Sequence, residues 1–369
     1  MKSIWKLCAA GTMVVLAGCG SSAPTDNSAA PDANAAAGGA TNGASNAVST
    51  STAGLTGAGA TFPYPIYSKW FEAYKAKNGV EINYQSIGSG GGIKALMGNT
   101  VDFGASDAPL KPEEEAKMPT PMLHIPTVAG SVAIAYNLPG IPTGLHLTGS
   151  VLADIYLGKI TKWNDPAIAK LNASAKLPST AITVVHRSEG SGTTNIFTTY
   201  LKTISPDWAA KVGSGKEVKW PVGLGGKGNS AVAAQITQNP GAIGYIELAY
   251  ALSSKSPVVA LQDKDGDFVL PSVDSTTAAV AGGLADLQKD IKSPIVNEAG
   301  KGAYPIAGVT YLLVYKIQSD ATKEKTLVDF LNWAMTDGQG MAKDLNYAPL
   351  PSALVTVNQA AISSISVKQ

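Results

Sequence analysis

A glycine- and hydroxyl-rich loop follows a short β-branched strand near the middle of the chain. The loop ends in Gly190-Ser-Gly-Thr193, and Arg187 stands just before it. An apolar helical pattern begins directly after the loop, so the loop's N–H groups would lie at the positive end of a helix. Free N–H groups, hydroxyls and a guanidinium fork are the donors that hold an oxyanion. The loop therefore predicts an anion site, although an ordinary capped helix with a solvated Arg187 has the same local pattern.

Three further segments offer related chemistry. Thr61 and Phe62 lie between a small-residue strand and a helical pattern, and Ser89 stands at the start of another helix after a turn. Each can present a hydroxyl or a backbone N–H at a helix N-terminus. Asp107, after a buried strand, adds one acceptor. Taken singly, Thr61 could be a simple N-cap and Asp107 a turn former.

The elements that would position these loops alternate between strand and helix. Strands are predicted from residue 55 and over residues 80–85, 101–107, 131–136, 182–185, 242–246 and 306–316. Helices are predicted over residues 66–78, 89–98, 151–157 and 196–201, from residue 230, and over 327–334. This alternation predicts an α/β fold with two doubly wound lobes. Ligands are then expected where loops at the carboxyl ends of the strands meet.

An enzyme is the rival class, for example a serine hydrolase or phosphatase that uses Ser191. The sequence disfavours it, because Gly190-Ser-Gly lacks the G-x-S-x-G elbow and a serine nucleophile needs an oriented base. His186 adjoins Arg187 on one strand, so their side chains should point to opposite faces. No metal-ligand motif, P-loop or G-x-G-x-x-G fingerprint is present. We therefore expect a protein that is not an enzyme and that uses neither cofactor nor metal.

The first 18 residues have the pattern of a secretory signal peptide. Lys2 and Lys6 flank the start of a short apolar run, and Leu16-Ala-Gly-Cys19 resembles a bacterial lipobox. This resemblance implies cleavage before Cys19, which becomes the acylated (palmitate-bearing) first residue of a lipoprotein; the alternative is a plain signal peptide with an incidental Cys19. Residues 20–53 are almost entirely small or polar, so residues 19–53 should form a lipidated cysteine and a disordered tether.

The charge and cysteine content of the chain limit the classes of partner and ligand that it can bind. The chain has 28 Lys and Arg against 27 Asp and Glu, and loss of Lys2 and Lys6 leaves 26 basic residues and a formal net charge of −1. No broad basic surface for nucleic acid is indicated. The two cysteines are Cys8 and Cys19, so the mature chain has neither an intramolecular disulfide nor a thiolate metal cluster.

Five ordered motifs resemble the family of high-affinity phosphate-binding proteins of bacterial phosphate ABC importers. They are Thr56–Pro63, Val101–Pro109, Ile155–Ile160, Gly190–Thr193 and Trp220–Asn229. The resemblance runs from residue 55 to near the C-terminus. It implies a periplasmic-binding-protein fold, with residues 54–127 plus 307–369 as lobe 1 and 128–306 as lobe 2. Two crossovers, near Thr127 and Ile306, would join lobes that close on one phosphate.

The resemblance also implies a set of phosphate-binding residues: Thr61, Phe62, Ser89, Asp107, Arg187, Ser191, Gly192 and Thr193. The implied partners are inorganic phosphate and the membrane-embedded permease of an ABC importer. The chain would be a monomer in the periplasm or cell envelope, anchored through Cys19. Two features depart from the family: soluble members lack the lipobox and tether, and Glu189 stands where many relatives have Asp. A binder of sulfate or molybdate would share the fold and would be distinguished mainly by Asp107.

Overall fold

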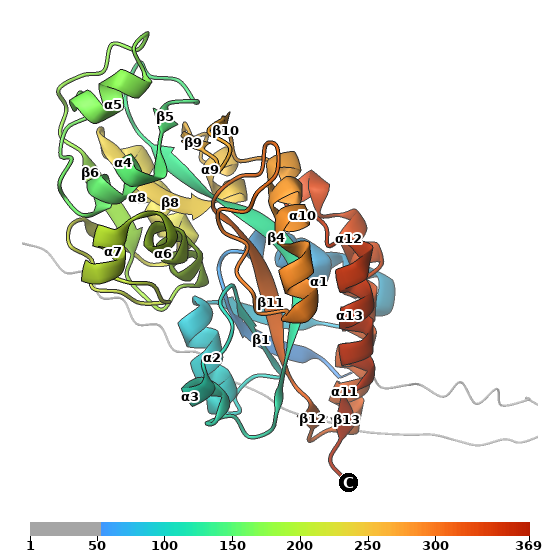
Figure 1. Cartoon of the computed structure of the whole chain (residues 1–369). Coiled ribbons are helices and arrows are strands. Elements are labelled where there is room, and N and C mark those ends of the chain that lie inside the picture. Colours follow the sequence, from blue (N-terminus) through green and yellow to red (C-terminus); the bar gives the residue numbers. More distant parts are fainter. Residues whose placement is uncertain (1–52) are drawn as a thin grey trace, which may run out of the picture. The chain divides into compact units, whose positions relative to one another are not determined.

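The computed structural model of the chain describes residues 53–369 (Figure 1). The predicted signal peptide, the lipidated Cys19 and the predicted tether up to residue 52 lie outside these residues. Among the residues that the structure describes, no helix is long and apolar enough to cross a membrane.

The main sheet has eight strands in the order β2-β1-β3-β11-β4-β8-β6-β7. Their bounds are β1 (Leu55–Gly59), β2 (Ile82–Ser86), β3 (Phe103–Ser106), β4 (Met122–Tyr136), β6 (Thr183–Arg187), β7 (Leu224–Gly226), β8 (Ala242–Glu247) and β11 (Ala307–Tyr315). A three-stranded sheet contains β5 (His146–Leu147), β9 (Ala260–Gln262) and β10 (Phe268–Val269), and β12 (Ile317–Gln318) pairs with β13 (Ser366–Val367).

Strand β4 connects two parts of the main sheet. Its residues up to Ser131 pair with β11, and those from Val132 onward pair with β8. We call β2-β1-β3-β11 the first half-sheet and β8-β6-β7 the second half-sheet; β4 runs through both. The prediction of a strand limited to residues 131–136 was wrong, because β4 begins at Met122. Residues 124–136 are buried throughout, and a strand covered on both faces lacks the alternation that would show its full length.

The helices of the first third of the chain are α1 (Tyr64–Asn78), α2 (Ser89–Met97) and α3 (Pro112–Glu115). The middle third contains α4 (Gly149–Tyr156), α5 (Pro166–Leu171), α6 (Gly192–Ile204), α7 (Pro206–Lys211), α8 (Gly228–Gln238) and α9 (Leu248–Ser253). The remainder contains α10 (Val273–Lys289), α11 (Ala321–Ala334), α12 (Asp337–Gly340), a 3-10 turn (Lys343–Leu345) and α13 (Ser352–Ser363).

The predicted strand-and-helix alternation is confirmed for the elements that carry the candidate loops. Helix α1 ends where expected, because Gly79 adopts the left-handed conformation with φ of 71°. Helix α8 begins at Gly228 rather than at Ser230, since residues 224–226 form the edge strand β7 beside β6. The preceding loop is therefore shorter and more tightly held than its composition suggested.

Apolar packing fixes both half-sheets. Helices α10 and α13 pack side by side against β4, and α11 lies on the other side of α13, next to β1 (Figure 1). Around the second half-sheet, Phe197 of α6 stacks on Tyr245 of β8 with ring centroids 4.3 Å apart. This contact anchors α6 beside the strand whose neighbour, β6, ends at Arg187. The N-terminus of α6 is thereby held at the carboxyl end of the sheet.

Candidate functional site

The structure brings all eight predicted site residues to one region, at loops that follow β1, β2, β3 and β6. The loops touch directly: the Gly90 N–H donates to the Gly190 carbonyl oxygen at 2.8 Å. Each of the eight is buried, and Thr61 is 6% exposed. The alternative of a solvated Arg187 at the surface is wrong, because this residue is only 3% exposed.

At the N-terminus of α6, two of the predicted N–H donors, those of Ser191 and Gly192, are used inside the part of the protein that the structure describes, and the Thr193 N–H is not. Ser191 is the N-cap, and its hydroxyl accepts a hydrogen bond from the Thr194 N–H at 3.1 Å. The Gly192 N–H donates to Ser89 Oγ at 3.0 Å. A Cβ at residue 192 would lie 2.5 Å from Asp107 Oδ2, so only glycine permits this approach of α6 to the loop after β3.

Several buried backbone N–H groups around this region have no protein acceptor. Among hydrogen bonds formed within residues 53–369, none uses the N–H of Thr61, Phe62, Ser89 or Thr193. A buried donor without a partner is costly, roughly 1–3 kcal/mol each, so such groups are rare unless a ligand or water satisfies them. These four N–H groups lie at the N-termini of three helices, α1, α2 and α6, and such positions suit an anion.

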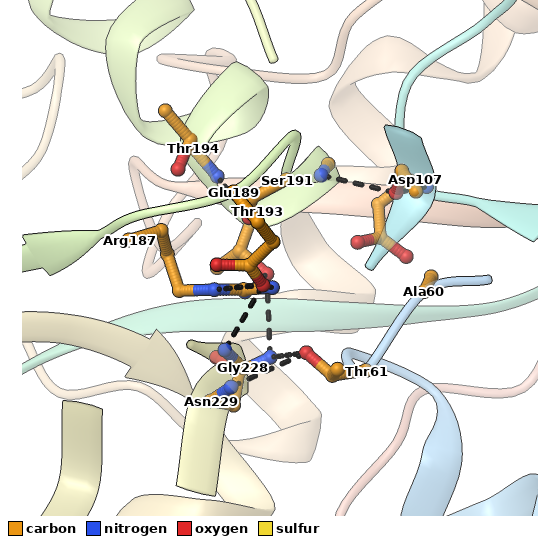
Figure 2. Close-up of polar contacts among 12 residues, drawn as sticks. Ala60, Thr61, Asp107, Arg187, Glu189, Ser191, Thr193, Thr194, Gly228 and Asn229 are labelled. Atoms are coloured by element: carbon orange, nitrogen blue, oxygen red, sulfur yellow. Dashed lines mark hydrogen bonds and ion pairs between the residues drawn. The ribbon is translucent and has the colours of Figure 1, made fainter. Parts of the chain in front are cut away.

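Arg187 is fixed by contacts on every side. Its backbone N–H donates to the Tyr245 hydroxyl at 3.0 Å, and its Nη1 donates to Thr193 Oγ1 at 3.2 Å. Nε donates to Glu189 Oε1 at 3.0 Å, and Nη2 contacts the same oxygen (Figure 2). Glu189 Oε1 also accepts from the Gly228 N–H at 2.9 Å. The longer carboxylate of Glu189 therefore orients the guanidinium and ties it to the start of α8.

Asp107 supplies the acceptor of the site. Its Oδ1 accepts a hydrogen bond from Thr310 Oγ1 at 2.7 Å, and Figure 2 shows its carboxylate directed toward the side on which Arg187 and Thr61 lie. Burial raises the pKa of Asp107 to about 7, although the Thr310 hydrogen bond and the Arg187 charge act in the opposite direction. This carboxyl group can therefore either accept or release a proton near neutral pH.

Sequence reasoning missed two residues that hold the site together. Asn229 Nδ2 donates to Thr61 Oγ1 at 2.8 Å and lies 3.4 Å from Thr193 Oγ1, so it bridges loops of the two half-sheets. Its signal was its position at the end of the Trp220–Asn229 motif. Thr310 lies in a buried apolar strand next to a register shift, where Thr127 of β4 is the extra residue. A bulge can redirect a side chain toward a site. The hydroxyl group of Thr310 in an otherwise apolar strand was the sequence feature that could have indicated its role.

The composition of the chain also points to Arg187. It is the only arginine among the 369 residues, and all other basic residues are Lys or His. Arginine differs from lysine in offering a planar, bidentate donor, so its single occurrence in this loop was a signal for an oxyanion site.

The surroundings of Ser191 do not match a serine nucleophile. His186 stacks on Trp220 with centroids 4.7 Å apart, and His124 Nε2 accepts from the Leu110 N–H at 3.0 Å. Burial lowers the pKa of His124 to about 4, so its ring is neutral. Across residues 53–369, no hydrogen bond joins Ser191 to a histidine, and no group of His, Cys, Asp and Glu there could hold a metal ion.

The chain matches a family described as the PBP superfamily domain over residues 35–337. It is 46% identical over 315 residues to the phosphate-binding protein PstS of Pasteurella multocida, covering 85% of this chain and 91% of that protein. The PstS of Xylella fastidiosa strain Temecula1 is also 46% identical, over 311 residues, covering 84% of this chain and 85% of that protein.

The chain belongs to the PstS family of phosphate-binding proteins. The resemblance drawn from the five motifs is thus confirmed. Among solved structures, a high-affinity periplasmic phosphate-binding protein, PfluDING, bound with phosphate, superposes with a TM-score of 0.66 at 22% identity, covering 83% of this chain and 93% of that one. That likeness confirms the periplasmic-binding-protein fold. The PstS relatives are named as binding proteins and not as enzymes.

Proposed function

We propose that this chain binds inorganic phosphate outside the cytoplasmic membrane and delivers it to an ABC-type phosphate importer. The observation that carries the proposal is the meeting of unpaired buried N–H groups, Arg187 and Asp107 at one place, in a PstS-family chain. Phosphate near neutral pH offers several acceptor oxygens and at least one proton. Many donors and a single acceptor complement that ligand, whereas a fully deprotonated anion would leave Asp107 without a hydrogen to accept.

The proposed phosphate shell is the predicted one: Thr61, Phe62, Ser89, Asp107, Arg187, Ser191, Gly192 and Thr193. Arg187 would neutralise charge and supply the one guanidinium. Thr61, Phe62, Ser89 and Thr193 would donate their N–H groups, because those groups lack protein acceptors within the described residues. Glu189 and Asn229 would orient Arg187 and Thr61 without contacting phosphate themselves.

We further propose that residues 54–127 plus 307–369 and residues 128–306 form two lobes that close on the ligand, with α10 of the second segment packed against β11 and α13 of the first. Support comes from β4, which passes from one half-sheet to the other, and from the site's donors, which come from both. Phosphate can bias closure only through contacts that exist in the closed form. Small-angle scattering should show a smaller radius of gyration when phosphate is added, and an unchanged radius in a binding-competent protein would contradict closure.

For localisation, we propose that the mature chain is a monomer tethered to a membrane by acylated Cys19, where it meets the permease of the importer. The lipobox and the tether sequence support this arrangement. Multiple acylation of one cysteine provides firm attachment, because a single chain binds membranes only marginally. Protein with Cys19→Ala should leave the membrane fraction, and unchanged partitioning would refute the anchor.

Calorimetry of the mature domain with phosphate, arsenate, sulfate and a phosphate monoester tests the function. Phosphate should bind at one site and arsenate should compete, since both are protonated near neutral pH, while sulfate and the ester should bind far more weakly. Preference for sulfate would identify the alternative oxyanion binder. Release of phosphate from the ester, lost in Ser191→Ala, would instead support a hydrolase.

A further inference from the structure

Helix α3 is a single acidic turn that follows β3 of the first half-sheet and lies next to α2 (Figure 1). Glu114 Oε2 accepts the backbone N–H of Lys111 at 2.9 Å and pairs with Lys216 Nζ at 2.6 Å. The contact to Lys111 fixes the carboxylate as part of the cap of α3. Glu114 is thereby held in place to receive a lysine from a segment 102 residues away.

Lys216 connects this turn to the candidate site. Its carbonyl oxygen accepts the Ser191 N–H at 2.9 Å, immediately before α6 begins. The side chains of Lys216 and Glu114 are only 9% and 19% exposed. A second pair lies beside it: Lys292 Nζ is 2.5 Å from Glu115 Oε1, with side chains 35% and 39% exposed.

We propose that the Glu114–Lys216 ion pair is an affinity determinant that forms on closure and slows phosphate release. This inference rests on the proposed function and on the proposed lobes, which place Glu114 in lobe 1 and Lys216 in lobe 2. When the lobes separate, the two side chains part and water solvates each charge. When the lobes close, the pair forms in a largely buried position and adds stability to the closed form alone.

The burial of the Glu114–Lys216 pair determines how strongly the loss of either charge changes the stability of the closed form, and in which direction. Exposed ion pairs contribute little, whereas removing one partner of a buried pair leaves an uncompensated charge. The Glu115–Lys292 pair is more exposed and should matter less. Neutralising Glu114 or Lys216 therefore penalises closure rather than folding, because the remaining charge is hydrated in the open form. Phosphate leaves only when the lobes open, so the loss should appear in the dissociation rate.

The test compares Glu114→Gln, Lys216→Met, the double variant and Glu113→Gln in the mature domain. Glu113 is the matched control: it lies in the same turn, its side chain is 66% exposed, and its nearest lysine, Lys111, is 3.8 Å away. Stopped-flow release of phosphate should be about tenfold faster in each single variant, which corresponds to roughly 1.4 kcal/mol. The double variant should be no faster than the singles, because the pair acts as a unit.

Two measurements distinguish an effect of the ion pair on closure from a general loss of folding stability. The free energy of unfolding without phosphate should change little in the variants, and the association rate should stay near wild type. Release within twofold of wild type in both single variants would overturn the inference, as would an equal effect of Glu113→Gln. If the wild-type domain itself fails to bind phosphate in calorimetry, the proposed function fails instead, and this outcome is distinguishable at the first step.

Discussion

Thr310 Oγ1 donates a 2.7 Å hydrogen bond to Asp107 Oδ1. The bond commits one oxygen of this buried carboxylate to a strand of the sheet, while Oδ2 lies close to Gly192 at the start of α6. Oδ2 is thus the oxygen available to a ligand. In the proposed phosphate site, an ionised Asp107 would accept a hydrogen from the ligand through this oxygen.

We expect Asp107→Asn to weaken the preference for phosphate over sulfate. The amide keeps the shape of the side chain but offers an N–H donor, so sulfate no longer meets an opposing acceptor while phosphate loses a charge-assisted bond. Competition of sulfate against labelled phosphate, in wild type and variant, measures the change. Equal preference ratios in the two proteins would place selectivity elsewhere.

The same carboxylate should make stability depend on pH. The pKa of Asp107 is raised from 3.8 to about 7, so the folded state retains a proton that the unfolded state releases. The contribution of Asp107 to the free energy of unfolding should then be largest below about pH 4 and fall as pH rises to 7, by up to about 1.4 kcal/mol per pH unit. Urea titrations of phosphate-free protein between pH 4 and 8 should show a shallower fall in Asp107→Asn.

Glu247 provides the comparison for that experiment. Burial raises the pKa of Glu247 well above its usual range, so it contributes a slope of the same sign. Glu247→Gln should remove a separate share of the pH dependence, and the double variant should remove both. An unchanged profile in Asp107→Asn alone would mean that Asp107 is ionised throughout this range in the folded protein.

Because Arg187 is the only arginine, its Nε–H gives a single side-chain signal in a nitrogen-15 spectrum. We expect that signal to shift on phosphate addition and to be absent from Arg187→Lys. The lysine variant retains charge but loses the fork that contacts both Glu189 and Thr193, so affinity should fall at least about tenfold. Phosphate binding that leaves the signal unmoved would remove Arg187 from the site.

Gly192→Ala should abolish closure around phosphate. The added Cβ would lie 2.5 Å from atoms of Asp107, which belongs to a different loop, so the loops after β3 and β6 could not meet. Gly340→Ala is the matched control, since a Cβ there meets nothing within 4 Å. Calorimetry should detect phosphate binding in the control and none in Gly192→Ala, while both unfold near the wild-type temperature. Full binding by Gly192→Ala would show that the close approach is dispensable.

The sequence alone determined the local parts of this protein. The end of α1 could be placed because Asn78-Gly79 stops a helix, and α6 could be recognised because its apolar residues recur with the helical period. The donor types near Arg187 and Thr61 followed from loops that open helices. The family followed from ordered motifs rather than from any single residue.

Only the tertiary structure decided which loops meet. Asn229 and Thr310 are distant in sequence from Thr61 and Asp107, the residues to which they hydrogen-bond. These bonds depend on strand order and on the β-bulge at Thr127. The length of β4 was equally hidden, since burial on both faces removes the polar alternation that marks a strand's ends. Pairing between distant segments leaves no local pattern in the sequence. The sequence therefore shows which functional groups are present, and the fold determines which of them come into contact.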